Sequence, residues 1–109
     1  MIRKTLYDKN NKRVMRVTFT LPCSLWADSI YLVGAFNNWA EDSHPLERNE
    51  RGEWVITVDL ALGKAYQFRY LVDNHNWTND DNADAYVRNF YGSDNFLVVT
   101  DPDFRKYQD

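Results

Sequence analysis

Residues 65–73 read "AYQFRYLVD", and this stretch decides the fold class. Apolar side chains recur at every second position, at Tyr66, Phe68, Tyr70 and Val72. The positions between and after them hold Gln67, Arg69, Leu71 and Asp73. A repeat of two is the repeat of a β-strand that turns one face to a core. The stretch therefore predicts a half-buried strand with Arg69 on its polar face.

The same repeat runs through the rest of the chain. "RVMRVTFTL" (13–21) and "EWVITVDL" (53–60) alternate in the same way, and "SIYLVG" (29–34) and "NFLVVT" (95–100) are short runs rich in β-branched residues. No segment shows a sustained helical stripe, and turn residues separate the runs. About seven short strands at this spacing predict an all-β fold, an immunoglobulin-like antiparallel β-sandwich. A true immunoglobulin domain is excluded because there is no Cys…Trp…Cys pattern.

Length, charge and cysteine content limit the classes of protein that remain. A chain of 109 residues is long enough for one domain, so we expect a single domain over residues 1–109. The net charge of −3 argues against nucleic acid, and no apolar run approaches the roughly 20 residues that cross a bilayer. Cys23 is the only cysteine, which suits a reducing compartment. These features predict a cytoplasmic protein with neither nucleic-acid nor membrane partners.

The charge is concentrated at the N-terminus, which leaves a protein partner open. The first 16 residues contain six cations against one acid, Asp8: Arg3, Lys4, Lys9, Lys12, Arg13 and Arg16. Such a cluster could dock an acidic partner, although a solvated pair of strands is the more usual explanation.

Four tryptophans divide into two groups by their surroundings. Trp54 lies on the apolar side of its strand, and Trp26, just ahead of a strand, is expected to plug the core or a sheet edge. Trp39 and Trp77 instead follow strand ends among Asn and Asp, each directly after an asparagine. An indole stacks on the C–H face of a sugar ring while amide and guanidinium groups bind its hydroxyls. Such loops indicate a sugar site that would include Arg69; the alternative is that both rings cap the sandwich.

Catalysis and metal binding find little support in the sequence. Glycoside hydrolysis needs two carboxylates, one of them sheltered, whereas Asp80, Asp81 and Asp84 crowd one polar loop. Asp80, Asn82 and Asp84 match the first spacings of a calcium loop, but its glycine position holds Ala85. We therefore expect no enzyme activity, no metal and no cofactor.

Several motifs together resemble one family. They are "GAFNNW" (34–39), "GKAYQFRYLVD" (63–73), "NW" at Trp77 and "YGSDNFLVV" (91–99). Over about residues 14–99 the chain resembles carbohydrate-binding module family 48. That family includes the early-set domain at the N-terminus of isoamylases and branching enzymes, and the glycogen-binding domain of the AMP-activated protein kinase β subunit. The resemblance implies an early-set β-sandwich.

The resemblance also implies a ligand and a set of site residues. The ligand is an α-1,4-linked glucan such as glycogen, starch or a malto-oligosaccharide. The family's stacking tryptophans fall on Trp39 and Trp77, and its basic hydroxyl donor, usually lysine, falls on Arg69. The remaining glucan contacts fall on Asn95, Tyr91 and Ser93. Phe36 would anchor the first loop, and its asparagines would hold the turn.

Two other functions stay open. One is a protein-interaction or regulatory module whose sugar site is vestigial and whose partner is a glucan-metabolising enzyme or another protein. The other is the N-terminal domain of a glucan-processing glycoside hydrolase.

Overall fold

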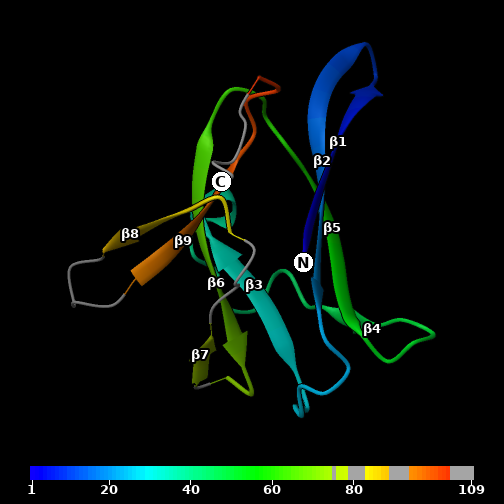
Figure 1. The fold of residues 1–109 in the computed structure, drawn as a ribbon, viewed down its shortest axis with the longest axis vertical. Helices are drawn as coiled ribbons and strands as arrows, with labels where there is room; N and C mark the ends of the chain where they lie inside the picture. Colours follow the sequence, from blue (N-terminus) through cyan, green and yellow to red (C-terminus); the bar gives the residue numbers. More distant parts are fainter. Residues whose placement is uncertain (75, 79–82, 89–93, 104–109) are drawn as a thin grey trace, which may run out of the picture.

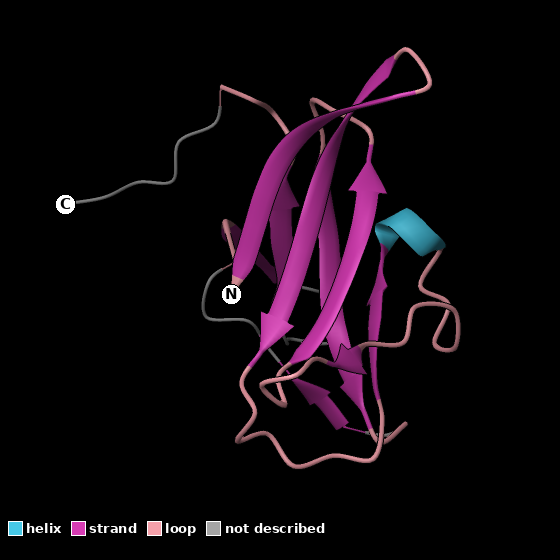
Figure 2. Cartoon of the chain, turned by 90° about the vertical axis from the view of Figure 1, so that its right-hand side faces the viewer, coloured by secondary structure: helices cyan, strands magenta, loops and turns pink. Residues whose placement is uncertain are grey.

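The computed structural model describes residues 1–74, 76–78, 83–88 and 94–103. Two antiparallel sheets pack face to face (Figures 1 and 2). One sheet has the order β1-β2-β5-β4, made of β1 (Ile2–Lys9), β2 (Lys12–Leu21), β5 (Trp54–Leu60) and β4 (Glu47–Arg48). The other has the order β3-β6-β9-β8, made of β3 (Ile30–Gly34), β6 (Ala65–Val72), β9 (Asp94–Val99) and β8 (Ala85–Arg88), with β7 (Asn76–Thr78) also paired to β6. A 3-10 turn, η1 (Ala35–Asn37), follows β3.

This architecture confirms the predicted β-sandwich, with nine strands in the described residues where about seven were expected. The two shortest strands are among those that the named runs of the sequence did not cover. β4 has two residues and β7 has three, so neither is long enough for an alternating pattern to be visible in the sequence.

The core lies between the sheets and is built from the alternating positions. On β6, Phe68, Tyr70 and Val72 are buried, and Trp54 on β5 is buried opposite them, as predicted. Phe19 of β2 meets Phe68 edge to face, with ring centroids 5.2 Å apart. Such edge-to-face contacts add to the energy of burying the rings. The intervening positions of β6 are thereby turned to the outer face of the five-stranded sheet.

The prediction for Trp26 is wrong. Its side chain is 90% exposed and plugs neither the core nor a sheet edge. The segment that carries it continues the alternation of a strand although it lies outside one. Leu25 and Ala27 pack against the core cluster, so the residue between them points outward. The prediction rested on the position of Trp26 just ahead of a strand, whereas the alternation within its own segment decides where the ring lies.

The N-terminal cations are mostly paired with acids of the same chain. Four ion pairs join Lys4 to Asp84, Lys9 and Arg16 to Asp59, and Arg13 to Asp8. The cluster therefore matches the solvated strand pair that was the more usual explanation.

Candidate functional site

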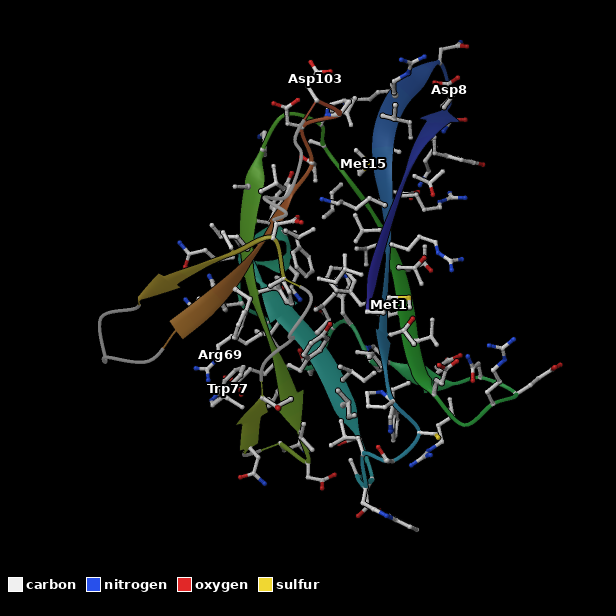
Figure 3. All side chains as sticks on the ribbon, viewed as in Figure 1. Met1, Asp8, Met15, Arg69, Trp77 and Asp103 are labelled. Carbon is white, nitrogen blue, oxygen red and sulfur yellow. The ribbon has the colours of Figure 1, made fainter. Side chains whose placement is uncertain are left out.

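The centre of the candidate site is the outer face of β6, which carries Arg69. Strand register places Val33 of β3 opposite Arg69, and Trp77 of β7 opposite Leu71. The Arg69 guanidinium carbon lies 5.5 Å from the centre of the Trp77 ring, within the range of a cation–π contact. Both side chains lie on the side of the sheet away from the other layer (Figure 3). The structure therefore brings together two residues that the sequence placed in one site.

Arg69 differs from an ordinary solvated strand cation. Its Nε atom is buried and is the one buried side-chain nitrogen or oxygen without a hydrogen-bond partner in the part of the chain described. A buried donor without an acceptor costs about 1–3 kcal/mol, so such groups are rare and call for an explanation. Arg69 thus has an unpaired Nε donor beneath a face that also carries an exposed aromatic ring.

Trp77 is held by a hairpin rather than by the loop that the sequence predicted. Asp73 and Asn74 both have a positive φ, of 53° and 66°, which Asp and Asn tolerate better than most residues. The chain then returns along β6 and places Trp77 in β7, where its side chain is 40% exposed. Strand pairing fixes the backbone under the indole and leaves much of the ring in solvent.

Trp39 is presented by a tightly built turn at the end of β3. Its backbone N–H donates to the Gly34 carbonyl at 2.9 Å, which ties it to the residue next to Val33. Asn38 and Trp39 both have a positive φ, of 57° and 59°. That conformation suits asparagine but is uncommon for a bulky residue such as tryptophan. The ring is 39% exposed, so a strained backbone holds an indole partly in solvent beside the strand that faces Arg69.

Three residues of "GAFNNW" explain the shape of the turn and how it is anchored. A Cβ atom at Gly34 would collide with the Gln67 carbonyl oxygen of β6, so only glycine allows β3 and β6 to approach there. Asn37 accepts from the Gly34 N–H through Oδ1 at 3.0 Å, and its Nδ2 donates to the Leu32 carbonyl at 3.2 Å. Phe36 packs against the core and meets the His44 ring edge to face. The structure thus bears out the anchoring of Phe36 and the turn-holding role of Asn37.

Asn95 lies beside the same face but is more enclosed than expected. The β6–β9 register, continued one step beyond the Phe68–Phe96 pair, sets Asn95 next to Arg69. Its side chain is only 9% exposed, and its Nδ2 donates to Gln67 Oε1 at 2.9 Å. Tyr91 and Ser93, the other two predicted glucan contacts, lie outside the described residues.

Sequence reasoning missed the apolar layer beneath this face. Val33 and Leu71 project from the outer side of the sheet, opposite the core, yet they are 0% and 2% exposed. Neither belongs to the main core cluster. The signal was present in the sequence, because an apolar residue at an outward strand position breaks the alternation and indicates cover on that side.

The comparisons with known proteins identify the family. A family model described as the glycogen recognition site of AMP-activated protein kinase matches residues 16–105, most of the chain. The chain belongs to this family. It is a carbohydrate-binding module, and the resemblance that its motifs showed is confirmed.

One relative is a 1,4-alpha-glucan-branching enzyme from Dictyostelium discoideum. It is 53% identical over 32 residues, which cover 29% of this chain and 5% of the enzyme. The match therefore spans a small part of that enzyme, and it adds a glucan-metabolising protein to the relatives of this chain.

Two further features bear on what the face could bind. Among the described residues, no group of three acidic, histidine or cysteine side chains is placed to hold a metal ion. Asp84, one of the calcium-like positions, accepts hydrogen bonds from Lys4 and the Val99 N–H, and its neighbours Asp80 to Asn82 lie outside the described residues. Within the described ranges, no helix has the length and apolar character needed to cross a membrane.

Proposed function

We propose that this module binds α-1,4-linked glucans, such as glycogen, starch and malto-oligosaccharides, through Trp77, Arg69 and Trp39. The observation that carries the proposal is the Arg69–Trp77 pair, a guanidinium 5.5 Å from a ring that is 40% exposed. The pair offers an apolar surface for the face of a sugar ring and donors for its hydroxyls. Family membership supports the same ligand class.

The remaining predicted contacts complete the proposed site. Trp39 would stack on a second sugar ring, because its turn is fixed to β3 beside the partner of Arg69. Asn95 would meet a hydroxyl from its position next to Arg69, with Tyr91 and Ser93 at the edge. An open face of this kind suits weak binding, with a Kd on the order of micromolar to millimolar.

We further propose that the chain forms one domain, catalyses no reaction and acts in the cytoplasm. The family that it belongs to recognises glycogen, and the sheltered carboxylate pair that glycoside hydrolysis needs is not apparent in its sequence. A lone exposed Cys23 supports a reducing compartment. The relation to a branching enzyme supports attachment to, or cooperation with, a glucan-metabolising enzyme.

The test is equilibrium binding of maltoheptaose by calorimetry, with variants that separate the site from its surroundings. Trp77→Ala should weaken binding by about 1–3 kcal/mol, by analogy with bases stacked on aromatic side chains. The chain offers a matched control in Tyr7, which is 40% exposed and lies under Arg16 at 3.5 Å on the other sheet. Tyr7→Ala should leave the affinity unchanged.

Two results would contradict the proposal. One is a wild-type protein that shows no heat of binding at millimolar maltoheptaose. The other is equal weakening by Trp77→Ala and Tyr7→Ala, which would show that a general loss of surface aromatics, and not this face, is being measured.

A further inference from the structure

Trp26 is the most exposed large hydrophobic residue described, at 90%, and the proposed glucan face does not include it. Its loop joins β2 of one sheet to β3 of the other. The loop is fixed on both sides of the ring, because Trp54 Nε1 donates to the Leu25 carbonyl at 3.3 Å and the backbone N–H of Asp28 donates to Asp73 Oδ1 at 2.7 Å. A well-anchored backbone thus holds an uncovered indole in water.

The surroundings of Trp26 suit a single sugar ring better than a protein surface. Protein-binding hot spots are clusters of buried aromatic and apolar anchors. The other exposed large hydrophobic residues described lie in or directly before the N-terminal strand or on the proposed glucan face: Met1, Leu6, Tyr7, Trp39 and Trp77. The neighbours of Trp26 in its own loop include Ser24 and Asp28, which offer polar groups to hydroxyls. One isolated ring, with Ser24 two residues before it and Asp28 two residues after it, matches the size and chemistry of one sugar unit.

The loop of Trp26 is also joined to the hairpin that carries Trp77. Asp73 accepts the N–H groups of Asp28 and Ser29 through one carboxylate oxygen and begins the turn into β7. Both segments lie at the lower end of the sandwich in Figure 1. Adding the lengths of the residues along this path gives an upper limit of about 25 Å for the distance between the Cα atoms of Trp26 and Trp77. An oligosaccharide of several rings can span any separation up to this limit, whereas one of two or three rings can span only the shorter part of that range.

We propose that Trp26 is a further stacking position for the same glucan chain, one that only longer malto-oligosaccharides reach from Trp77. This inference rests on the proposed function of the Arg69–Trp77 face. It adds a specificity, because a ring outside the main face makes affinity depend on chain length. Short ligands would occupy the main face alone.

The test compares maltotriose with maltoheptaose by calorimetry on the wild type, Trp26→Ala, Trp26→Phe and Trp77→Ala. Trp26→Ala should bind maltoheptaose at least about fivefold more weakly and maltotriose as well as the wild type does. Trp26→Phe keeps an aromatic face and should restore most of the loss. Trp77→Ala should weaken the binding of both ligands. Because Trp26 is exposed, its variants should melt at the wild-type temperature.

The outcomes separate this inference from the function on which it rests. If Trp77→Ala weakens binding while Trp26→Ala binds maltoheptaose like the wild type, the inference is wrong and the proposed function stands. Equal losses for both ligands in Trp26→Ala would also overturn it, because the effect would not depend on chain length. A wild type that binds neither ligand overturns both.

Discussion

At the scale of single residues, Trp39 combines a strained backbone with a partly exposed ring. Its φ of 59° places a bulky side chain in the left-handed region, which asparagine occupies with less strain. Strained conformations of this kind cost of order 1–3 kcal/mol and persist where the surrounding structure enforces them. Here the N–H bond to Gly34 and the Asn37 hydrogen bonds supply the enforcement. A tryptophan at a position that strains its own backbone indicates a role for the ring.

Trp39→Asn should separate the backbone from the ring. Asparagine tolerates the left-handed conformation, so we expect the melting temperature to stay the same or rise. Binding of maltoheptaose should weaken by about 1–3 kcal/mol, because the indole is lost. Thermal unfolding and calorimetry on this variant measure the two effects. A clear fall in melting temperature with unchanged affinity would mean that Trp39 caps the sandwich, the alternative that the sequence left open.

At the scale of elements, the two sheets use their outer faces differently. On the four-stranded sheet, Arg16 of β2 donates to Asp59 of β5 through Nε at 2.8 Å and through a terminal nitrogen at 3.1 Å. Lys9 of β1 lies 3.4 Å from the same carboxylate. These charges satisfy one another. On β6, Arg69 has no acidic partner among the described residues and keeps an unpaired donor. The contrast supports ligand binding on the five-stranded sheet.

The ion pairs of the four-stranded sheet predict a dependence of stability on pH. The hydrogen bond from Arg16, followed by that from Lys9, holds the pKa of Asp59 below its ordinary value. A carboxylate with a lowered pKa in the folded state stabilises the fold above its unfolded pKa, about 4, and loses this contribution as the pH falls through the folded value. The stability of the wild type should therefore fall more steeply below about pH 4 than that of Asp59→Asn.

Urea unfolding of both proteins at pH 7 and pH 3 measures this effect. At pH 7 the variant should be less stable by no more than about 1 kcal/mol, because the pair lies near the surface. At pH 3 the difference in unfolding free energy between the two proteins should be smaller. A difference in unfolding free energy of the same size at both pH values would show that Asp59 contributes through packing and not through its charge.

Short elements and loops also mark the limit of what the sequence could predict. The repeat of two located β2, β5 and β6 because each strand is seven residues or longer and has one buried face. It could not locate β7, whose three residues depend on pairing with β6. The sequence prediction misplaced Trp26, because Leu25 and Ala27 contact core residues that are distant in the sequence, and these contacts set the direction of the ring between them.

At the scale of the whole molecule, the sandwich places its core between the sheets and its candidate site on one outer face. The sequence grouped Trp39, Arg69 and Trp77 by their polar surroundings and by a family resemblance. Strand register brings Arg69 and Trp77 into contact, and Trp39 lies in the turn that follows β3, the strand paired with β6. The burial of Asn95 could not be predicted, because it depends on a partner, Gln67, from another strand. Resemblance could name these residues, whereas their exposure follows from packing across strands.

Glucan binding at the outer face of β6 can be followed directly by an NMR titration of the four tryptophan indole N–H signals with maltotriose. This short ligand should occupy the main face, so the signals of Trp39 and Trp77 should shift together and saturate with one Kd. The signal of Trp54, whose ring is buried and whose Nε1 donates to the Leu25 carbonyl, should stay in place, as should that of Trp26. If saturating maltotriose leaves the signals of Trp39 and Trp77 unmoved, this face does not bind glucan.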